Sequence, residues 1–207
     1  MLRFLADWSR PASPPAAGRT LPPRSNDADD AALVVRVAGG DVRAFEALFR
    51  AYHARLSRFL GLMTPRRTIV EEALNDTMFV VWRRAATYNH QSKVSTWIFA
   101  IAYRTALKAL QRQEEPVDNP AADEPASDER GPEQQRSERE TRAALAQALE
   151  GLSSEQRSVL VLTYFHDLPY AEIAQIMACP VDTVKTRMFH ARRRLRALLS
   201  GELGDWL

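Results

Sequence analysis

The clearest chemical pattern in the sequence lies between residues 169 and 196. A short helix is expected over 171–177, followed by a turn at 178–180 and a second helix that begins near Asp182. Asp182 or Thr183 can cap its first turn. Apolar residues recur on this second helix at steps of four and three, which predicts that one side of it is buried. Those residues are Val184, Met188, Ala191, Leu195 and Leu198.

The opposite side of this second helix carries hydroxyl, imidazole and cationic side chains. They are Thr183, Lys185, Thr186, Arg187, His190, Arg193 and Arg194. Two helices joined by a tight turn, with such a face on the second, meet the requirements for insertion into a DNA major groove. The first side chains would reach base edges and the later arginines would neutralise phosphates. An ordinary helical hairpin with a solvated basic face is the alternative interpretation.

A second pattern covers residues 71–82, where another helix with one apolar side is expected. The apolar side consists of Val70, Ala73, Leu74, Thr77, Met78, Val81 and Trp82. The outer side then presents Glu71, Glu72, Asn75, Asp76 and Phe79. Such a face suits a basic partner protein, with Phe79 as an apolar anchor at its centre. A solvated acidic face without a partner is the alternative.

A third pattern lies in residues 87–108, which contain no acid. A polar loop, made of Asn89, His90, Gln91, Ser92 and Lys93, leads into a helix that carries Trp97, Tyr103, Arg104 and Lys108. Aromatic rings beside cations and amides suit unpaired or flipped bases, which need stacking surfaces and a cationic track. Trp97 is on the apolar side and is expected in the core. We therefore assign the base contacts to the loop, Arg104 and Lys108.

Length and composition exclude several classes of protein. The chain has 207 residues, a single Cys and four His, so an intramolecular disulfide is impossible and no zinc-ligand spacing is present. The longest apolar stretches have fewer than ten residues, against about 20 for a membrane-spanning helix. The first 20 residues contain Asp7 and prolines where a signal peptide needs a continuous apolar core. These features favour a cytoplasmic protein with no membrane insertion.

The formal net charge of +2 hides a strong segregation along the chain. Residues 77–113 hold six basic residues and no acid, and residues 180–200 hold six basic residues and one acid. Between them, residues 114–140 hold ten acids and three arginines. Four prolines interrupt that acidic stretch, which has too few large apolar residues to offset the entropy of ordering its backbone. It is expected to be a flexible linker.

Apolar residues recur at three- and four-residue steps on both sides of the linker, which predicts an all-α protein of two small helical domains. Ser153 and Gln156 form a capping-box pattern in the second domain. The domains are expected over 29–112 and 140–200, joined by the linker at 113–139. Residues 1–28 and 201–207 are expected to be tails, the first of them disordered because it is rich in Pro and Ala.

The three patterns together resemble one family, the extracytoplasmic-function (ECF) sigma factors of bacterial RNA polymerase, which belong to the sigma-70 family and keep only regions 2 and 4. The resemblance covers about residues 41–112 and 140–200. The matching segments are EEALNDTMFVVW for region 2.2, STWIFAIAYR for regions 2.3 and 2.4, and LPYAEIAQIMACPVDTVKTRMFHARRRLR for region 4.2.

The resemblance implies a role for each pattern. The outer face of 71–82 would contact the clamp of the largest subunit of core RNA polymerase, and the second domain would meet the flap of the second-largest subunit. The loop at 89–93 and the helix after it would capture a base of the promoter −10 element during strand opening. The helix over 182–196 would read the −35 element. The resemblance also implies an anti-sigma factor as a further partner, and no cofactor, metal or catalytic residue is expected.

The sequence departs from the family pattern at four positions. Arg104 and Lys108 stand where the family often has Asn and Asp, so contacts there would be directed more to phosphates. Ala178 and Asp182 replace two frequent glycines. An alanine in a left-handed turn costs about 1 kcal/mol relative to glycine.

A stand-alone helix-turn-helix regulator is the alternative function, since it needs only the last of the three patterns. An enzyme is not expected. The sequence has no nucleophile elbow, no phosphate-binding glycine loop and no paired catalytic carboxylates. Its four histidines fall in different expected elements.

Overall fold

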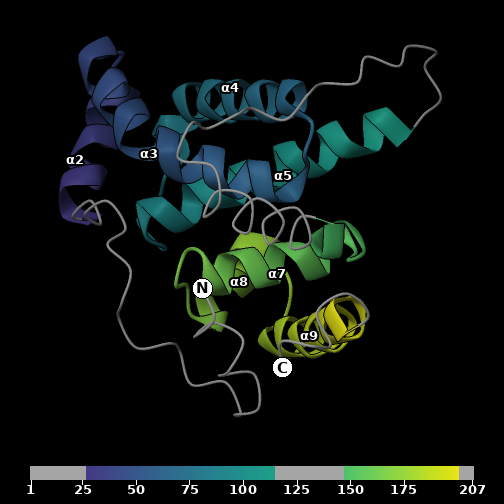
Figure 1. Ribbon diagram of the computed structural model, residues 1–207. Coiled ribbons are helices and arrows are strands. Elements are labelled where there is room, and N and C mark those ends of the chain that lie inside the picture. Colours follow the sequence, from purple (N-terminus) through teal and green to yellow (C-terminus); the bar gives the residue numbers. More distant parts are fainter. Residues whose placement is uncertain (1–26, 115–146, 201–207) are drawn as a thin grey trace, which may run out of the picture.

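The computed structural model describes residues 27–114 and 147–200, and all regular structure in these two ranges is helical (Figure 1). The N-terminal half, residues 27–114, contains α2 (Asp27–Ala38), α3 (Val42–Met63), α4 (Arg67–Arg84), the short 3-10 helix η2 (Ala85–Thr87) and α5 (Val94–Glu114). The C-terminal half, residues 147–200, contains a helical segment at 147–150, α7 (Ser154–Tyr164), α8 (Tyr170–Met177) and α9 (Val181–Ser200). The expectation of an all-α protein is confirmed.

The turn between α2 and α3 is fixed by one carboxylate. Oδ1 of Asp41 accepts hydrogen bonds from the backbone N–H groups of Arg43 and Ala44 at 2.9 and 3.1 Å, which caps α3. Oδ2 of Asp41 accepts from the guanidinium of Arg36 at 2.7 Å. The hydrogen bond from Ala44 and then the bond from Arg36 hold the pKa of Asp41 below its ordinary value. Gly40 has a φ of 84°, which its missing side chain permits.

The core of the N-terminal half forms where α3, α4 and α5 pack together. Every third or fourth residue of α3 is buried, as in Leu48, Leu56 and Phe59. Thr77 on α4 and Thr105 on α5 share a hydrogen bond of 2.7 Å between their hydroxyls, so the two helices are also joined by a polar contact. The hydroxyl of Tyr52 donates to Asp30 at 2.5 Å, which joins α3 to α2 through a buried pair.

The C-terminal half begins as the sequence predicts. The Ser153 hydroxyl accepts from the Gln156 N–H and the Gln156 side chain accepts from the Ser153 N–H, both at 3.3 Å, which completes the capping box of α7. Helix α8 ends at Ala178, whose φ of 50° and ψ of 47° are left-handed. The backbone N–H of Cys179 then bonds to the carbonyl of Ala174 at 3.0 Å and closes the turn into α9.

The two halves pack directly against each other. Helix α8 lies against α5, and α7 lies against α3. One continuous apolar cluster includes Phe59 and Phe99 of the N-terminal half together with Val161, Ile173 and Ile176 of the C-terminal half. The expected linker at 113–139 and the expected tails at 1–28 and 201–207 lie almost wholly outside the described residues. Only the first turn of α2 and the last residues of α5, through Glu114, overlap them.

The left-handed conformation of Ala178 predicts that Ala178→Gly stabilises the protein. Glycine removes the steric cost of a β-carbon at positive φ, and the free energy of unfolding in urea should rise by about 1 kcal/mol. Ala51→Gly is the matched control, because Ala51 is exposed in the middle of α3 and glycine there should lower stability by about 1 kcal/mol. Equal losses in both variants would contradict the assignment.

Candidate nucleic-acid interface

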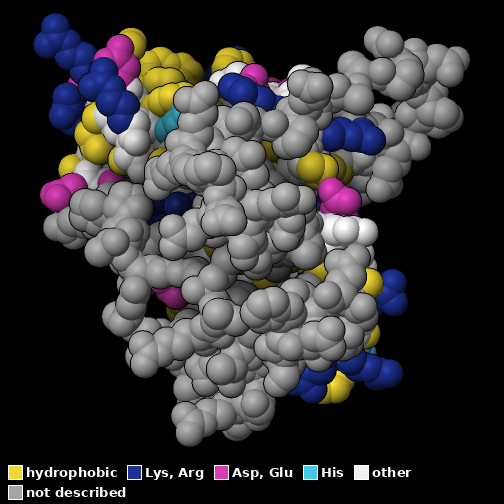
Figure 2. Space-filling view, in the orientation of Figure 1, with side chains coloured by type: hydrophobic (Ala, Val, Ile, Leu, Met, Phe, Trp, Pro, Cys, Tyr) yellow, Lys and Arg dark blue, Asp and Glu magenta, His cyan; other side chains and the backbone are white. Residues whose placement is uncertain are grey.

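Helix α9 has the two sides that the sequence predicts. Val184, Met188, Ala191 and Leu195 are buried, and Leu198 is half-buried. Exposed on the other side are Lys185, Thr186, His190, Arg193 and Arg194. The Asp182 carboxylate accepts a hydrogen bond from Lys185 at 2.9 Å, so its negative charge is offset at the start of the helix. Lys and Arg side chains gather on this part of the molecule, at the lower right of Figure 2.

Two arginines of α9 contact other residues of the protein and are only partly exposed to solvent. Arg187 is half-buried and directs Nη1 toward Sγ of Cys179 at 3.6 Å. Arg192 is also half-buried; its guanidinium lies 5.6 Å from the centre of the Tyr164 ring and donates to the Tyr164 hydroxyl. Thr183 is half-buried as well. The cations of α9 therefore divide into structural ones and ones that are available to a ligand.

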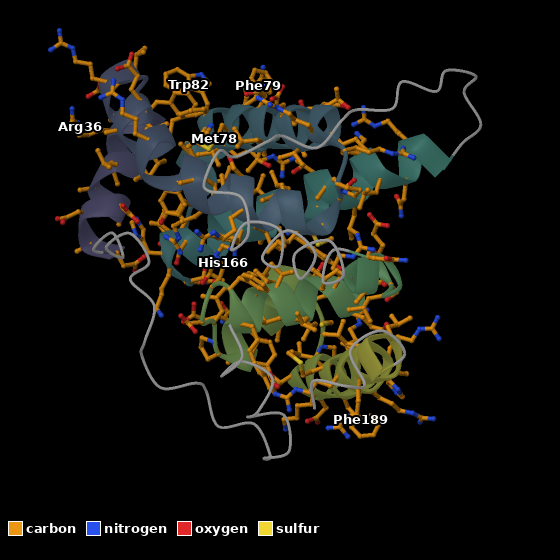
Figure 3. All side chains as sticks on the ribbon, in the orientation of Figure 1. Arg36, Met78, Phe79, Trp82, His166 and Phe189 are labelled. Atoms are coloured by element: carbon orange, nitrogen blue, oxygen red, sulfur yellow. The ribbon has the colours of Figure 1, made fainter. Side chains whose placement is uncertain are left out.

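Phe189 lies on the same exposed side and was not among the predicted contact residues. Its side chain is 62% exposed and its ring packs edge-on against His190, with centroids 5.4 Å apart. Figure 3 shows it pointing away from the body of the protein. A signal was present in the sequence, because Phe189 follows the buried Met188 directly and so falls outside the apolar stripe, between basic residues.

The acidic face predicted on α4 is exposed. It consists of Glu71, Glu72, Asn75, Asp76 and Phe79. Phe79 is 60% exposed, and the guanidinium of Arg83 lies over its ring, 5.8 Å from the ring centre. Glu71 pairs with Arg67 at 2.8 Å and Glu72 with Arg112 at 3.3 Å. On the opposite side, the predicted apolar residues are buried except Val70 and Trp82, which are half-buried. Helices α4 and α9 lie at opposite ends of the molecule (Figure 1).

The polar loop before α5 is held in a fixed shape. His90 has a φ of 59°, and the Tyr88 hydroxyl donates to the carbonyl of Ser92 at 2.6 Å. Asn89 Oδ1 accepts from the Gln91 N–H at 3.2 Å. Asn89, His90 and Gln91 are exposed, whereas the ammonium of Lys93 is paired with Glu172 of α8. Asn89, His90 and Gln91 are therefore accessible, whereas Ser92 is half-buried and Lys93 is engaged by α8.

Behind this loop lies a cationic cavity of about 220 Å³. It is lined by Val80, Arg84, Thr87, Trp97, Ile101, Arg104, Thr105 and Lys108. Burial and then the charge of Arg84 lower the pKa of Arg104. The structure thus brings together Arg104 and Lys108, as predicted, and adds Arg84 from α4. Trp97 is half-buried and lines the cavity, and its ring packs at a tilt against Tyr88 with centroids 5.3 Å apart, so it is more accessible than the core position expected for it.

Within 27–114 and 147–200, His, Cys, Asp and Glu residues form no group of three that could hold a metal ion. No helix in those same ranges is long and apolar enough to cross a membrane.

Comparison with protein families gives two matches along the chain. Residues 48–115 match the sigma-70 region 2 family, and residues 142–195 match the sigma-70 region 4 family. The first match covers α4, the polar loop and α5, and the second covers α7, α8 and most of α9.

Similar proteins extend over most of the chain. The ECF RNA polymerase sigma factor SigM of Mycobacterium tuberculosis is 30% identical over 174 residues, which are 84% of this chain and 86% of SigM. The ECF RNA polymerase sigma-E factor of Escherichia coli is 29% identical over 181 residues, or 83% of this chain and 94% of that protein.

Two solved structures share the fold. CnrH, in complex with the cytosolic domain of CnrY, aligns over 84% of this chain and 99% of CnrH, with a TM-score of 0.65 and 22% identity. The sigma factor RpoE of Bartonella quintana, in complex with the anti-sigma factor NepR, aligns over 76% of this chain and 98% of RpoE, with a TM-score of 0.55 and 22% identity. The chain therefore belongs to the ECF family of RNA polymerase sigma factors.

Proposed function

We propose that this sigma factor binds core RNA polymerase through the acidic face of α4, reads the −35 element with α9, and opens the −10 element with the polar loop and the cationic cavity. It carries out no catalysis of its own. The observation that carries the proposal is the separation of three exposed surfaces with different chemistry on one chain. One is acidic with an apolar anchor, one is a cationic cavity beside aromatic rings, and one is a cationic helix face.

Helix α9 suits duplex DNA. Its first exposed side chains, Lys185 and Thr186, can reach base edges, and Arg193 and Arg194 lie farther along the helix where phosphates would pass. Phe189 adds an apolar contact between these groups, of the kind that recognises the C5-methyl group of thymine. Arg192 contributes to this helix through Tyr164 and is assigned no DNA contact.

The cavity beside the polar loop suits a single strand. Trp97 offers a ring on which a base can stack, while Arg84, Arg104 and Lys108 provide positive charge for the adjoining phosphates. The exposed amides of Asn89 and Gln91 lie in the loop before this cavity and can hydrogen-bond a base edge. With His90, Ser92 and Lys93 they complete the proposed −10 contacts.

The acidic face suits a basic surface of the polymerase, and the clamp of the largest subunit is the proposed site. Region 4 would meet the flap of the second-largest subunit. The RpoE relative is bound to an anti-sigma factor. We propose that a comparable partner restrains this chain.

Asp76→Arg tests the α4 interface. Asp76 is exposed, so the variant should fold normally, but a cation placed against a basic partner should weaken binding to core polymerase at least about tenfold in a quantitative pull-down. Glu46→Arg on the exposed side of α3 is the matched control and should bind normally. Unchanged binding of the Asp76 variant would favour a stand-alone DNA-binding regulator.

Arg193→Ala and Arg192→Ala distinguish DNA-facing from structural cations. Loss of one phosphate contact should reduce the slope of log affinity against log salt by about one unit for Arg193→Ala. Arg192→Ala should leave the slope unchanged, because its guanidinium contacts Tyr164. Duplex binding by the chain assembled with core polymerase is the measurement. The same slope for wild type and Arg193→Ala would place Arg193 away from the DNA.

Phe189→Ala tests recognition of a thymine methyl group. In a duplex selected by the assembled polymerase, replacing the contacted thymine by deoxyuridine removes only the methyl group and should weaken wild-type binding about fourfold. The Phe189→Ala variant should bind the thymine duplex more weakly than wild type does. Replacing thymine by deoxyuridine should then weaken its binding no further. If wild type is insensitive to deoxyuridine at every −35 thymine, or if the two losses simply add, Phe189 does not read a methyl group.

A further inference from the structure

We propose that the contact between the two halves is an acid-sensitive latch: protonation of the buried His166 weakens this contact and favours separation of the halves. The consequence for promoter reading rests on the proposed function. The closed contact and its response to acid do not.

The latch has an apolar part and a polar part. The apolar part is the shared cluster in which α5 meets α8 and α3 meets α7. In the polar part, the ammonium of Lys93 pairs with Glu172, and the Thr96 hydroxyl donates to the same carboxylate at 3.2 Å. Arg157 of α7 donates to the carbonyl of Met63 at the end of α3. Lys93 is one of the proposed −10 contacts, so the closed form engages a residue that DNA would need.

The closed form also places the two DNA-reading surfaces too close together. The −10 and −35 elements are centred about 25 base pairs apart by their names, which corresponds to about 85 Å along B-form DNA. In the closed form α5 contacts α8, and α8 in turn contacts the DNA-reading helix α9. Reading both elements therefore requires the halves to separate. The chain between residues 114 and 147 can span at most about 110 Å, which is enough for the separation.

His166 lies inside this contact, between α7 and α8 (Figure 3). Its side chain is 6% exposed, and its ring packs against Phe59 of α3 and Phe99 of α5 with centroids 6.1 and 4.9 Å apart. Nε2 has no hydrogen-bond partner among the residues that the structure describes. A charged imidazolium in this place would be buried without a compensating group, which is costly.

The charges around His166 oppose its protonation further. From α3, the guanidinium of Arg55 lies 5.4 Å from the centre of the Phe99 ring, and the charge of Arg58 also acts on the imidazole. From α5, the Phe99 ring packs against His166. Asp167, the residue that follows His166 in the chain, is exposed. Burial first, and then Arg55 and Arg58, lower the pKa of His166 to about 3.

The direction of the pH effect follows from this environment. When the halves separate, His166 leaves Phe59, Phe99 and the two arginines and regains an ordinary pKa of about 6.5. The open form then binds a proton that the closed form rejects. Closure is fully favoured above about pH 6.5 and weakens about tenfold for each pH unit below it. Between pH 7.5 and 5.5 the ratio of open to closed chain should rise about tenfold.

Pulsed electron-electron distance measurement on the full chain tests the latch. Spin labels are attached at Ala47→Cys on α3 and Gln175→Cys on α8, both exposed positions, in a Cys179→Ser background. A single short distance is expected at pH 7.5 and an added longer population at pH 5.5. The same titration is repeated in Glu172→Gln, which removes the ion pair with Lys93. This variant raises the open population, so that a change with pH can be measured. Circular dichroism at both pH values checks that the helices persist.

The matched variants assign the response to one residue. His166→Phe fills the site with a ring that cannot be protonated and should remove the pH response. His53→Gln, at an exposed histidine of α3, should retain it. An open-to-closed ratio that does not change between pH 7.5 and 5.5, or a response that persists in His166→Phe, overturns the proposal.

Transcription from a promoter by core polymerase and the same chain distinguishes a failure of the proposed function from a failure of the latch. A chain that opens in acid but directs no transcripts contradicts the proposed function and supports the latch. A chain that directs transcripts but shows no acid-dependent opening contradicts the latch alone.

Discussion

The packing of the C-terminal half onto α3 and α5 determines how the surfaces of the closed chain are arranged. Phe59, Phe99, Ile173 and Ile176 join one apolar cluster, so the helix-turn-helix unit and the α4–α5 unit complete a common core. Because apolar contact is non-directional, the cluster alone would permit several docking angles. The bonds of Glu172 to Lys93 and Thr96, and that of Arg157 to the Met63 carbonyl, add directional contacts between the halves.

This packing orients the charged surfaces outward. The acidic face of α4 and the cationic face of α9 lie at opposite ends of the molecule, with Phe79 and Phe189 exposed on them (Figure 3). A polymerase surface could therefore dock on α4 while the halves remain together. The polar loop differs, because Lys93 is held by α8. Binding of polymerase and release of the −10 surface are thus separable steps in this architecture.

Local patterns in the sequence were enough to predict the helices from α3 onward, the capping box at Ser153 and the buried side of α9, whereas α2 was not predicted. These depend on residues three or four positions apart. The pairing of Lys93 with Glu172 joins residues 79 positions apart, and no local pattern indicates it. The same holds for His166, which the sequence places in a connecting segment, and for Arg84, which joins Arg104 only through the packing of α4 on α5. The roles of the individual site residues stay predictions.

The central claim is that the two halves must separate for the chain to act on a promoter. The most direct test is the distance between labels on α3 and α8, measured in the free chain and in the complex with core polymerase and promoter DNA. The account predicts a short distance in the free chain and an increase of several tens of ångströms in the complex, as the spacing of the two elements requires. An unchanged distance in a complex that produces transcripts would contradict it.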